Sequence, residues 1–593
     1  MKLRDALTRK KIIIASSVLV VGLVVAGFFA LRRPPRVAMD RYVPKDVLAY
    51  VEINNLADLI DGLTSTKAWR ELAPVLGLSS QLRQVGFAAD LIGRSGLGPD
   101  EAVVAGRAQY AIAITGIESK AGETEEGAYL HLKPDFALII ETHSNPETAS
   151  RLVGERASLI AQRIYGESVV ELSDDYRGSR LLVFHGPDAT RQLVVSSTGS
   201  VIIVANQANA MKLCLDAIAG RAAALAEDST LKRMRPEVGR DPSAFAYVTP
   251  SGIEKLVELW PVLIAGRGPV PEGISLFADL IEHISKQAGA GVLYSSEFGE
   301  GGVTETYLTV LRPQIAEALS QSLKSASQAG FASLGMIPRT IESLVLLNVE
   351  GAGELPERVL KQLSPNIDVV AGVALREFVI SFREPYGLAP SDSVGDALGS
   401  EIAVVSFGDS QPSQPSQPRM MLLRVNDRSR IAPIVNRYLA RKAARITAEQ
   451  DTGIEVLVSS NEDRRAAAFV GDFLVLGTRD QIGTIIATQA NRDGIDGDER
   501  LKQGLSTRPA EASIVSYRPR VEDAGKLLLG ISKLMRVSDG SQELLDRDEA
   551  RKAIDRLPPS ISFTEFRSYG VYTQTHSAVG NFSSIASLIG SGE

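Results

Sequence analysis

The stretch VLAYVEI at residues 47–53 decides the fold, because it has the pattern of a short apolar strand that leads into a helix. A second stretch, SLVLLNV at residues 343–349, is of the same kind. The helices that follow carry apolar residues on one face, at Leu56, Leu59, Ile60 and Leu63 in the first case and at Leu355, Val359, Leu360 and Leu363 in the second. The chain therefore begins the same α+β pattern twice.

The two patterns stay in step further along the chain. In each copy a Gly-Leu-x-Pro turn precedes a β-rich run, and an Asp-x-x-Leu-Lys motif comes later and is followed by an Arg-Pro pair. The turns are 96–99 and 387–390, the β-rich runs 110–115 and 402–407, the motifs begin at Asp228 and Asp498, and the pairs begin at Arg235 and Arg508. A chance match between common αβ patterns is the alternative to duplication.

This order of elements predicts an α+β fold with two tandem duplicated modules, residues 40–334 and residues 335–593. Strand-rich runs that lie close in sequence and alternate with helices favour largely antiparallel sheets with helices packed on one face. The segments 116–134 and 410–418 connect the first two sheet strands of each copy. Both are polar and contain proline, so we expect exposed tips there.

Residues 12–31 are twenty residues without a charge. As a helix they would span about 30 Å, the thickness of one hydrocarbon core. The segment is longer than the apolar region of a cleaved signal peptide, and Arg32, Arg33 and Pro34 follow it in place of a small-residue cleavage site. We therefore expect residues 1–39 to form a cytoplasmic tip, an uncleaved single-pass transmembrane anchor and a basic linker.

Charge separates this amino-terminal part from the body. Residues 1–39 hold eight basic groups and one acid, a net charge of +7, so a chain total of −7 leaves −14 for residues 40–593. The basic flank before residue 12 slightly favours a cytoplasmic amino terminus, which places the body in the periplasm or outside the cell. An acidic body without basic patches repels phosphate backbones, so no nucleic-acid partner is expected.

Motifs for nucleophilic or cofactor chemistry are missing from the sequence. The 593 residues include one cysteine, Cys214, in an apolar helical pattern typical of a buried thiol. Ser95 follows Gly93 but lacks the last glycine of a nucleophile elbow. Gly289 and Gly291 begin like a dinucleotide loop, but they precede a strand and not a helix. We therefore name no catalytic or cofactor-binding residue.

Two clusters of histidine or acidic residues in the sequence could in principle bind a metal ion. His131, Asp135, Glu141 and His143 bracket one strand, and exposed polar residues at the ends of that strand are the preferred interpretation. A turn that contains Asp493, Asp496, Asp498 and Glu499 lacks the ligand spacing of a calcium loop, and a solvated turn is preferred there. No metal site is therefore predicted.

The start of the body, VPKDVLAYVEINNL at residues 43–56, resembles the opening of an uncharacterised bacterial family with a domain of unknown function. The resemblance implies one amino-terminal membrane anchor and a long αβ ectodomain, and it supplies no site residues.

Together these observations favour a cell-envelope protein of the inner membrane that acts as a binding or scaffolding unit and not as an enzyme, with a site near residues 325–345 where the two modules join. A carboxylate-dependent envelope hydrolase is one alternative, because pairing of acids in space is invisible in sequence. An accessory subunit of a transport or secretion complex is another, and it predicts an exposed apolar patch or a second membrane-seeking segment, for which residues 582–589 are a candidate.

Overall fold

The protein is described here by a computed structural model that covers residues 35–76, 99–124, 127–186, 191–265, 289–326, 330–367, 372–373, 376, 394–407, 419–440, 445–460, 464–520 and 548–580. The predicted anchor at 12–31 lies outside these residues, as do Ser95 and the apolar tail at 582–589. Among the described residues no helix combines the length and the apolar character needed to cross a bilayer.

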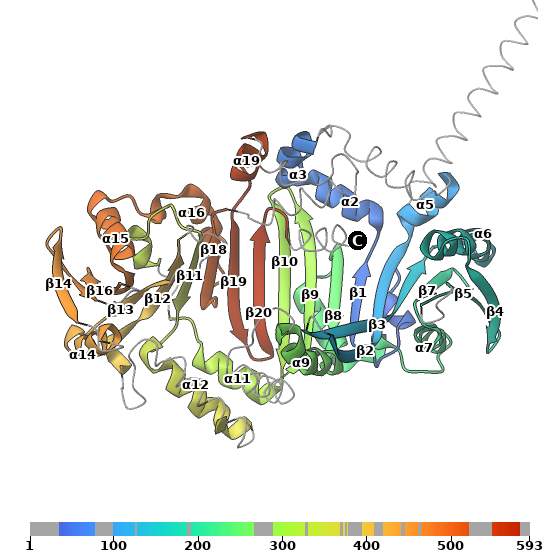
Figure 1. The fold of residues 1–593 in the computed structure, drawn as a ribbon, viewed down its shortest axis with the longest axis horizontal. Coiled ribbons are helices and arrows are strands. Elements are labelled where there is room, and N and C mark those ends of the chain that lie inside the picture. Colours follow the sequence, from blue (N-terminus) through green and yellow to red (C-terminus); the bar gives the residue numbers. More distant parts are fainter. Residues whose placement is uncertain are drawn as a thin grey trace, which may run out of the picture.

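The described strands form one large antiparallel sheet of twenty strands, so the chain has an α+β fold (Figure 1). From one end to the other the pairing runs β4-β5-β6-β7-β3-β2-β1-β8-β9-β10, then β20-β19-β18-β11-β12-β13-β17-β16-β15-β14. The long axis of the molecule runs across the strands, with β4 near one end and β14 at the other (Figure 1). The two halves meet where β10 pairs with β20.

The first half contains the following elements: η1 (Met39–Tyr42), β1 (Ala49–Ile53), α2 (Leu56–Ser65), α3 (Lys67–Leu72), η2 (Ala73–Leu76), α5 (Pro99–Arg107), β2 (Gln109–Thr124), β3 (Gly127–Glu141), α6 (Pro146–Tyr165), β4 (Val170–Tyr176), β5 (Ser179–His185), β6 (Gln192–Thr198), β7 (Val201–Ala205), α7 (Ala208–Ile218), η3 (Leu225–Glu227), α8 (Ser229–Met234), η4 (Arg235–Val238), β8 (Ala244–Val248), α9 (Pro250–Ala265), β9 (Gly289–Gly299) and β10 (Gly302–Leu311).

The second half contains α11 (Pro313–Ser322), η5 (Ala332–Gly335), β11 (Ser343–Asn348), η6 (Ala352–Glu354), α12 (Leu355–Leu363), η7 (Ser364–Asn366), η9 (Gly395–Ala397), β12 (Leu398–Ser406), β13 (Met420–Val425), α14 (Arg428–Leu439), β14 (Ile446–Asp451), β15 (Ile454–Ser459), β16 (Arg465–Val470), β17 (Phe473–Thr478), α15 (Arg479–Asn491), η11 (Ile495–Gly497), α16 (Glu499–Ser506), β18 (Ile514–Arg518), α19 (Asp548–Asp555), β19 (Ser560–Arg567) and β20 (Gly570–Ser577).

The ten strands of each half pair in the same order, with β11 in the place of β1 and each later strand in the place of its counterpart. Details repeat as well. The tight turns between β4 and β5 and between β14 and β15 both have two residues of positive φ, Arg177 and Gly178 in one and Thr452 and Gly453 in the other. This is the backbone of a type I′ hairpin turn, whose twist matches that of the strands.

Isolated bridges repeat too, and they allow the two halves to be aligned residue by residue. Pro44 bridges to Ala224 in the first half, and Pro338 bridges to Gly494 in the second. The helices α8 and α16 then begin at matching caps, because the side chains of Asp228 and Asp498 each accept a backbone hydrogen bond from the first turn.

Helices cover both faces of the sheet, so the prediction of helices on one face was wrong. Adjacent residues of a strand point to opposite faces. Leu181 packs in a core with Met211 of α7, whereas Leu182 packs with Val153 of α6 on the other side. The second half repeats this arrangement, with α15 on one face and α14 on the other. Each end of the molecule is therefore a three-layer sandwich.

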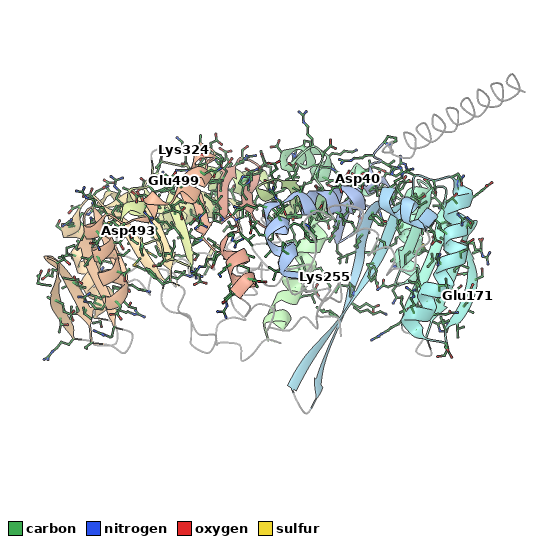
Figure 2. The ribbon with its side chains drawn as sticks, turned by 90° about the horizontal axis from the view of Figure 1, so that it is seen from above. Asp40, Glu171, Lys255, Lys324, Asp493 and Glu499 are labelled. Carbon is green, nitrogen blue, oxygen red and sulfur yellow. The ribbon has the colours of Figure 1, made fainter. Side chains whose placement is uncertain are left out.

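Two further expectations need correction. The segment 116–134 is not a loop: β2 and β3 continue pairing to Thr124 and Gly127 and form a two-stranded ribbon that projects from the body (Figure 2). The corresponding segment 410–418 lies outside the described residues. The two Arg-Pro pairs are not equivalent either, because Arg235 lies seven residues after the Asp228 cap, and the residue seven after Asp498 is Leu505.

The two cores begin slightly before the predicted module boundaries. Met39 is fully buried in the first core, and Phe331 and Leu334 are buried in the second. The predicted boundaries at residues 40 and 335 therefore cut into η1 and η5, the short helices that lead into each half.

Candidate functional site

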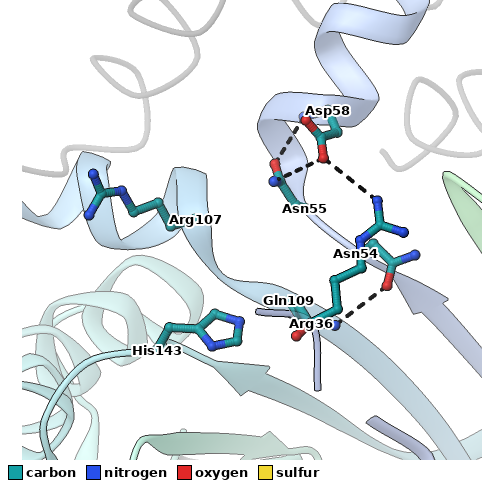
Figure 3. Close-up of a pocket in the computed structure, with 7 residues that line it drawn as sticks. All are labelled: Arg36, Asn54, Asn55, Asp58, Arg107, Gln109 and His143. Atoms are coloured by element: carbon teal, nitrogen blue, oxygen red, sulfur yellow. Dashed lines mark hydrogen bonds and ion pairs between the residues drawn. The ribbon is translucent and has the colours of Figure 1, made fainter. Parts of the chain in front are cut away.

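A polar pocket lies in the first half, where the described chain begins. Its cavity of ≈ 230 Å³ is lined by Arg36, Asn54, Asn55, Asp58, Arg107, Gln109 and His143 (Figure 3). It does not lie near residues 325–345, where the sequence placed a site.

Strand and helix ends bring these side chains together. Asn54 and Asn55 follow β1, and Asn55 caps α2 by accepting a hydrogen bond from the backbone N–H of Asp58 at 2.9 Å. Arg107 ends α5, and Gln109 begins β2 two residues later. His143 comes two residues after the end of β3. The site is thus built where the sheet ends and its connections begin.

The amide side chains of Asn54 and Gln109 line the pocket, and Gln109 also holds the backbone of Val37. The Oε1 atom of Gln109 accepts a hydrogen bond from the backbone N–H of Val37 at 2.7 Å, and its Nε2 donates to the Val37 carbonyl at 3.0 Å. Asn54 donates from Nδ2 to the carbonyl of Pro242 at 2.7 Å. Both amides are almost fully buried, so these bonds are needed to avoid unpaired polar groups.

The two arginines that line the pocket differ in their ion pairs. Arg36 lies 3.0 Å from Asp241 and 3.8 Å from Asp58. Among the described residues, no ion pair or side-chain hydrogen bond is found for the guanidinium of Arg107, which extends away from Asn55 and Asp58 (Figure 3). Asp58 is the one acid among the lining residues, so the described pocket lacks the carboxylate pair that a glycosidase-type hydrolase needs.

His143 has an unusual backbone. Its φ of 51° lies in the left-handed region that non-glycine residues seldom adopt, and its backbone N–H donates to Oε1 of Glu141 at 3.0 Å. Burial lowers the pKa of His143, so its ring is uncharged at neutral pH. The ring is turned toward Gln109 and Arg36 (Figure 3). The pocket can therefore offer neutral and cationic hydrogen-bonding groups to a small polar ligand.

A buried ionic cluster lies in the core of the same half. Arg235 pairs with Glu52 at 2.7 Å and with Asp40 at 3.4 Å, and its guanidinium lies over the ring of Phe245. The hydroxyl of Tyr50 donates to Glu52 at 2.9 Å. Glu52 is 2% exposed and Asp40 is 8% exposed, and neither lines the pocket. These two acids therefore share an arginine in the core and do not face the cavity.

The residues singled out from the sequence as metal candidates are not brought together. His131 pairs with Lys120 on the projecting ribbon, while His143 lies beyond the other end of β3, more than about 30 Å away along the strand. No cluster of His, Cys, Asp or Glu that could hold a metal is found in the described part of the chain.

The acidic residues Asp493, Asp498 and Glu499 of the turn at 493–499 form ion pairs and a helix cap. Asp493 lies 3.3 Å from Arg339, Asp498 caps α16, and Glu499 lies 2.9 Å from Lys502. Each of these three carboxylates has its own partner, so they do not converge on one point.

The remaining candidates have packing roles. Cys214 is fully buried on α7, and burial raises the pKa of its thiol to about 12, so the reactive thiolate is not formed at neutral pH. At Gly291, φ is 143° and a side chain would collide with the ring of Tyr247. This glycine therefore makes room for a core tyrosine.

Of the seven lining residues, sequence reasoning had singled out only His143, and for a different role. The other six come from three separate segments and share no motif. No protein-family model, curated protein or solved structure matches the chain. The site is thus assigned by its geometry alone.

Proposed function

We propose that this chain is a single-pass membrane-anchored protein of the bacterial cell envelope whose body, two duplicated modules, is a non-catalytic binding or scaffolding unit. Residues 12–31 would form the anchor in the inner membrane, and the body would face the periplasm or the cell exterior. The pocket of the first half is its candidate ligand site.

The observation that carries this proposal is the way the halves are joined. Each half ends in its tenth strand, and β10 and β20 pair over eight residues from Val303 to Val310. Hydrogen bonds across this pair make one sheet of two halves, so a hinge between them would have to break a strand pair. A rigid, elongated body suits a protein that holds partners at fixed positions better than one that closes on a substrate.

Duplication is supported by the repeated strand order, by the repeated I′ turns and by the paired bridges of Pro44 and Pro338. A tyrosine at the same distance from the helix cap adds to this. Tyr247 and Tyr517 each lie nineteen residues after the capping aspartate, and both are buried in the core. The agreement of pairing order, turn geometry and spacing favours duplication over a chance match between common αβ patterns.

The linker supports a body held close to the membrane. Five residues separate the end of the apolar segment from Val37, which is hydrogen-bonded to Gln109. Six peptide steps reach at most about 20 Å, and Pro34 and Pro35 keep such a linker stiff. The first half would therefore remain near the bilayer, while the second half extends away from the tether along the sheet.

Fractionation and crosslinking test the proposal. We expect the full chain to stay in the membrane pellet at alkaline pH, and a chain that lacks residues 1–34 to be released. In vivo crosslinking followed by affinity capture from detergent should then recover discrete envelope partners with the full chain. Recovery of the intact full chain in the soluble fraction would disprove the anchor, and glycan or lipid turnover by the purified chain would favour the hydrolase alternative.

A further inference from the structure

The helix α6 carries exposed apolar side chains that its counterpart α14 lacks. Leu159 is 47% exposed, Ile160 is 48% exposed and Ile164 is 58% exposed. Both helices follow the third strand of their half and begin at a side-chain cap, from Asn145 and from Asp427. In the described part of α14, no large apolar side chain is exposed to this degree.

The difference lies in the length of the two helices. α14 has 12 residues and α6 has 20 residues. Aligned from their caps, α14 matches α6 as far as Ala157, and all three exposed apolar residues belong to the extension beyond it. The packing face of α6 consists of Ala149, Val153, Ala157 and Ala161, so it continues into the extension. Leu159, Ile160 and Ile164 do not belong to this buried core, and about half of each side chain stays exposed.

The extension also lies on the tethered side of the molecule. Val37 is held by Gln109, two residues after the end of α5, and Glu101 of α5 accepts hydrogen bonds from Nε and Nη2 of Arg156 on α6. Ile160 is one helical turn beyond Arg156. Figure 1 likewise places α5 and α6 together at one end of the molecule, and β14 at the other. A tether of about 20 Å therefore brings this end of the body to the bilayer.

We propose that the surface of Leu159, Ile160 and Ile164, the α6 apolar surface, inserts into the lipid bilayer and fixes the orientation of the body on the membrane. This inference rests on the anchor in the proposed function. When apolar side chains on a membrane-facing helix enter the boundary between headgroups and acyl chains, the transfer out of water lowers the free energy of the system. Because the anchor already holds the protein at the membrane, three side chains suffice to orient it.

Spin labels on the full chain test this in vesicles of phosphatidylethanolamine and phosphatidylglycerol. Labels are attached to single cysteines introduced by Ile164→Cys, Leu159→Cys and Asn436→Cys, the last on the exposed side of α14. Buried Cys214 has a thiol pKa of about 12 and should not react, which the unsubstituted chain checks. Collisions of each label with oxygen, which concentrates in lipid, and with a water-soluble paramagnetic metal complex are then compared.

We expect the labels at positions 159 and 164 to shift toward oxygen collisions in vesicles, and the label at 436 to remain accessible to the metal complex. The label at Ile164→Cys, one turn from Ile160 on the same helix, should lose its lipid signature when Leu159 and Ile160 are changed to glutamine. If the labels at 159 and 164 behave like the label at 436, the inference is wrong. It is equally wrong if both collision agents are excluded, because protein would then cover the surface.

A label at Val20→Cys separates this inference from the anchor. A lipid-exposed label at position 20 with water-exposed labels on α6 leaves the anchor standing and rejects the α6 apolar surface as a lipid contact. Water exposure at all of these positions rejects both.

Discussion

The two halves share the same order of strand pairing but differ in the side chains that are buried in their cores. Four residues of the ionic cluster in the first half, Asp40, Tyr50, Glu52 and Arg235, correspond by the alignment of bridges, strand pairs and helix caps to Leu334, Leu344, Leu346 and Leu505 in the second. Leu334, Leu344 and Leu346 are buried in the second core, and Leu505 packs against it. The same fold therefore accepts either a charged network or a purely apolar filling at this place.

This difference shows that the ionic cluster is not required by the architecture. Burial of charges costs hydration free energy, and pairing in the core recovers it only with good geometry. The second half satisfies the same strand order with leucines, which need no partners. The ionic cluster and the polar pocket both belong to the first half, so its interior holds more polar groups at these places than that of the second half.

The largest expected effect concerns the join between the halves. Gly570 has a φ of 150°, and a Cβ there would collide with the carbonyl oxygen of Thr309 on β10. Gly302 holds the equivalent position, with a φ of 135° and a collision against the carbonyl oxygen of Ser577. We expect Gly570→Ala to lower the free energy of unfolding by more than about 4 kcal/mol, because backbone must move.

Denaturant unfolding of the detergent-solubilised chain, followed by circular dichroism, measures this. Gly301→Ala in the turn that precedes β10 is the control, because nothing lies within 4 Å of a Cβ there. A change in Gly570→Ala no larger than that of the control would mean that β10 and β20 are not paired as described.

The second effect tests whether the first half can adopt the interior of the second. Glu52→Leu alone leaves Arg235 buried without its closest partner, so we expect a loss of about 3 kcal/mol. The fourfold change of Asp40, Tyr50, Glu52 and Arg235 to leucine removes every member of the cluster, and we expect it to be neutral or stabilising relative to the unsubstituted chain. The same unfolding measurement applies. A fourfold variant less stable than Glu52→Leu would show that the halves are not interchangeable at this place.

The α+β class and the antiparallel sheet are predictable from the sequence, because short apolar strands alternate with helices twice along the chain. The order in which the strands pair, with β1 between β2 and β8, was not predicted. Helices on both faces were missed, although adjacent Leu181 and Leu182 already indicate a strand buried on two sides. The ribbon of β2 and β3 was missed because glycine, lysine and glutamate between residues 116 and 134 conceal its pairing. In physical terms, local composition reports exposure better than it reports backbone pairing.

The residues of the pocket could not be predicted from the sequence, and the cause is different. Its side chains stand singly at the ends of elements, and only the sheet brings Asn54 beside Gln109 and His143. The buried cluster left one visible trace, the glutamate in VLAYVEI where the second copy has leucine. The sequence alignment of 47–53 with 343–349 hid that contrast, because it places Glu52 opposite Asn348. The strand pairs shift this alignment by two residues and place Glu52 opposite Leu346.

A smaller effect concerns the matching I′ turns. Thr452 is β-branched and has a φ of 52°, which is strained, whereas asparagine tolerates this conformation. We expect Thr452→Asn to raise the free energy of unfolding by about 1 kcal/mol. Arg177→Asn relieves similar strain but removes an ion pair with Asp216 at 3.0 Å and a contact with the ring of Tyr176, so we expect almost no net change. Equal gains in both variants would contradict this account of the first turn.

The smallest effect is the pH dependence that one histidine in each half contributes. Burial lowers the pKa of His143 and of His576 below the ordinary value of 6.5, so the unfolded chain binds these protons first as the pH falls. Their contribution to stability is therefore complete above pH 6.5 and is lost as the pH drops below it.

We expect His143→Asn to flatten the decrease in the free energy of unfolding between neutral and mildly acidic pH, because asparagine accepts the left-handed backbone and does not titrate. His576→Gln should flatten it further, and the double variant should remove the part of the slope that these two histidines contribute. If His143→Asn leaves the slope unchanged while His576→Gln removes it, the titrating histidine belongs to the second half alone, and the ring of His143 is not buried beside the pocket as described.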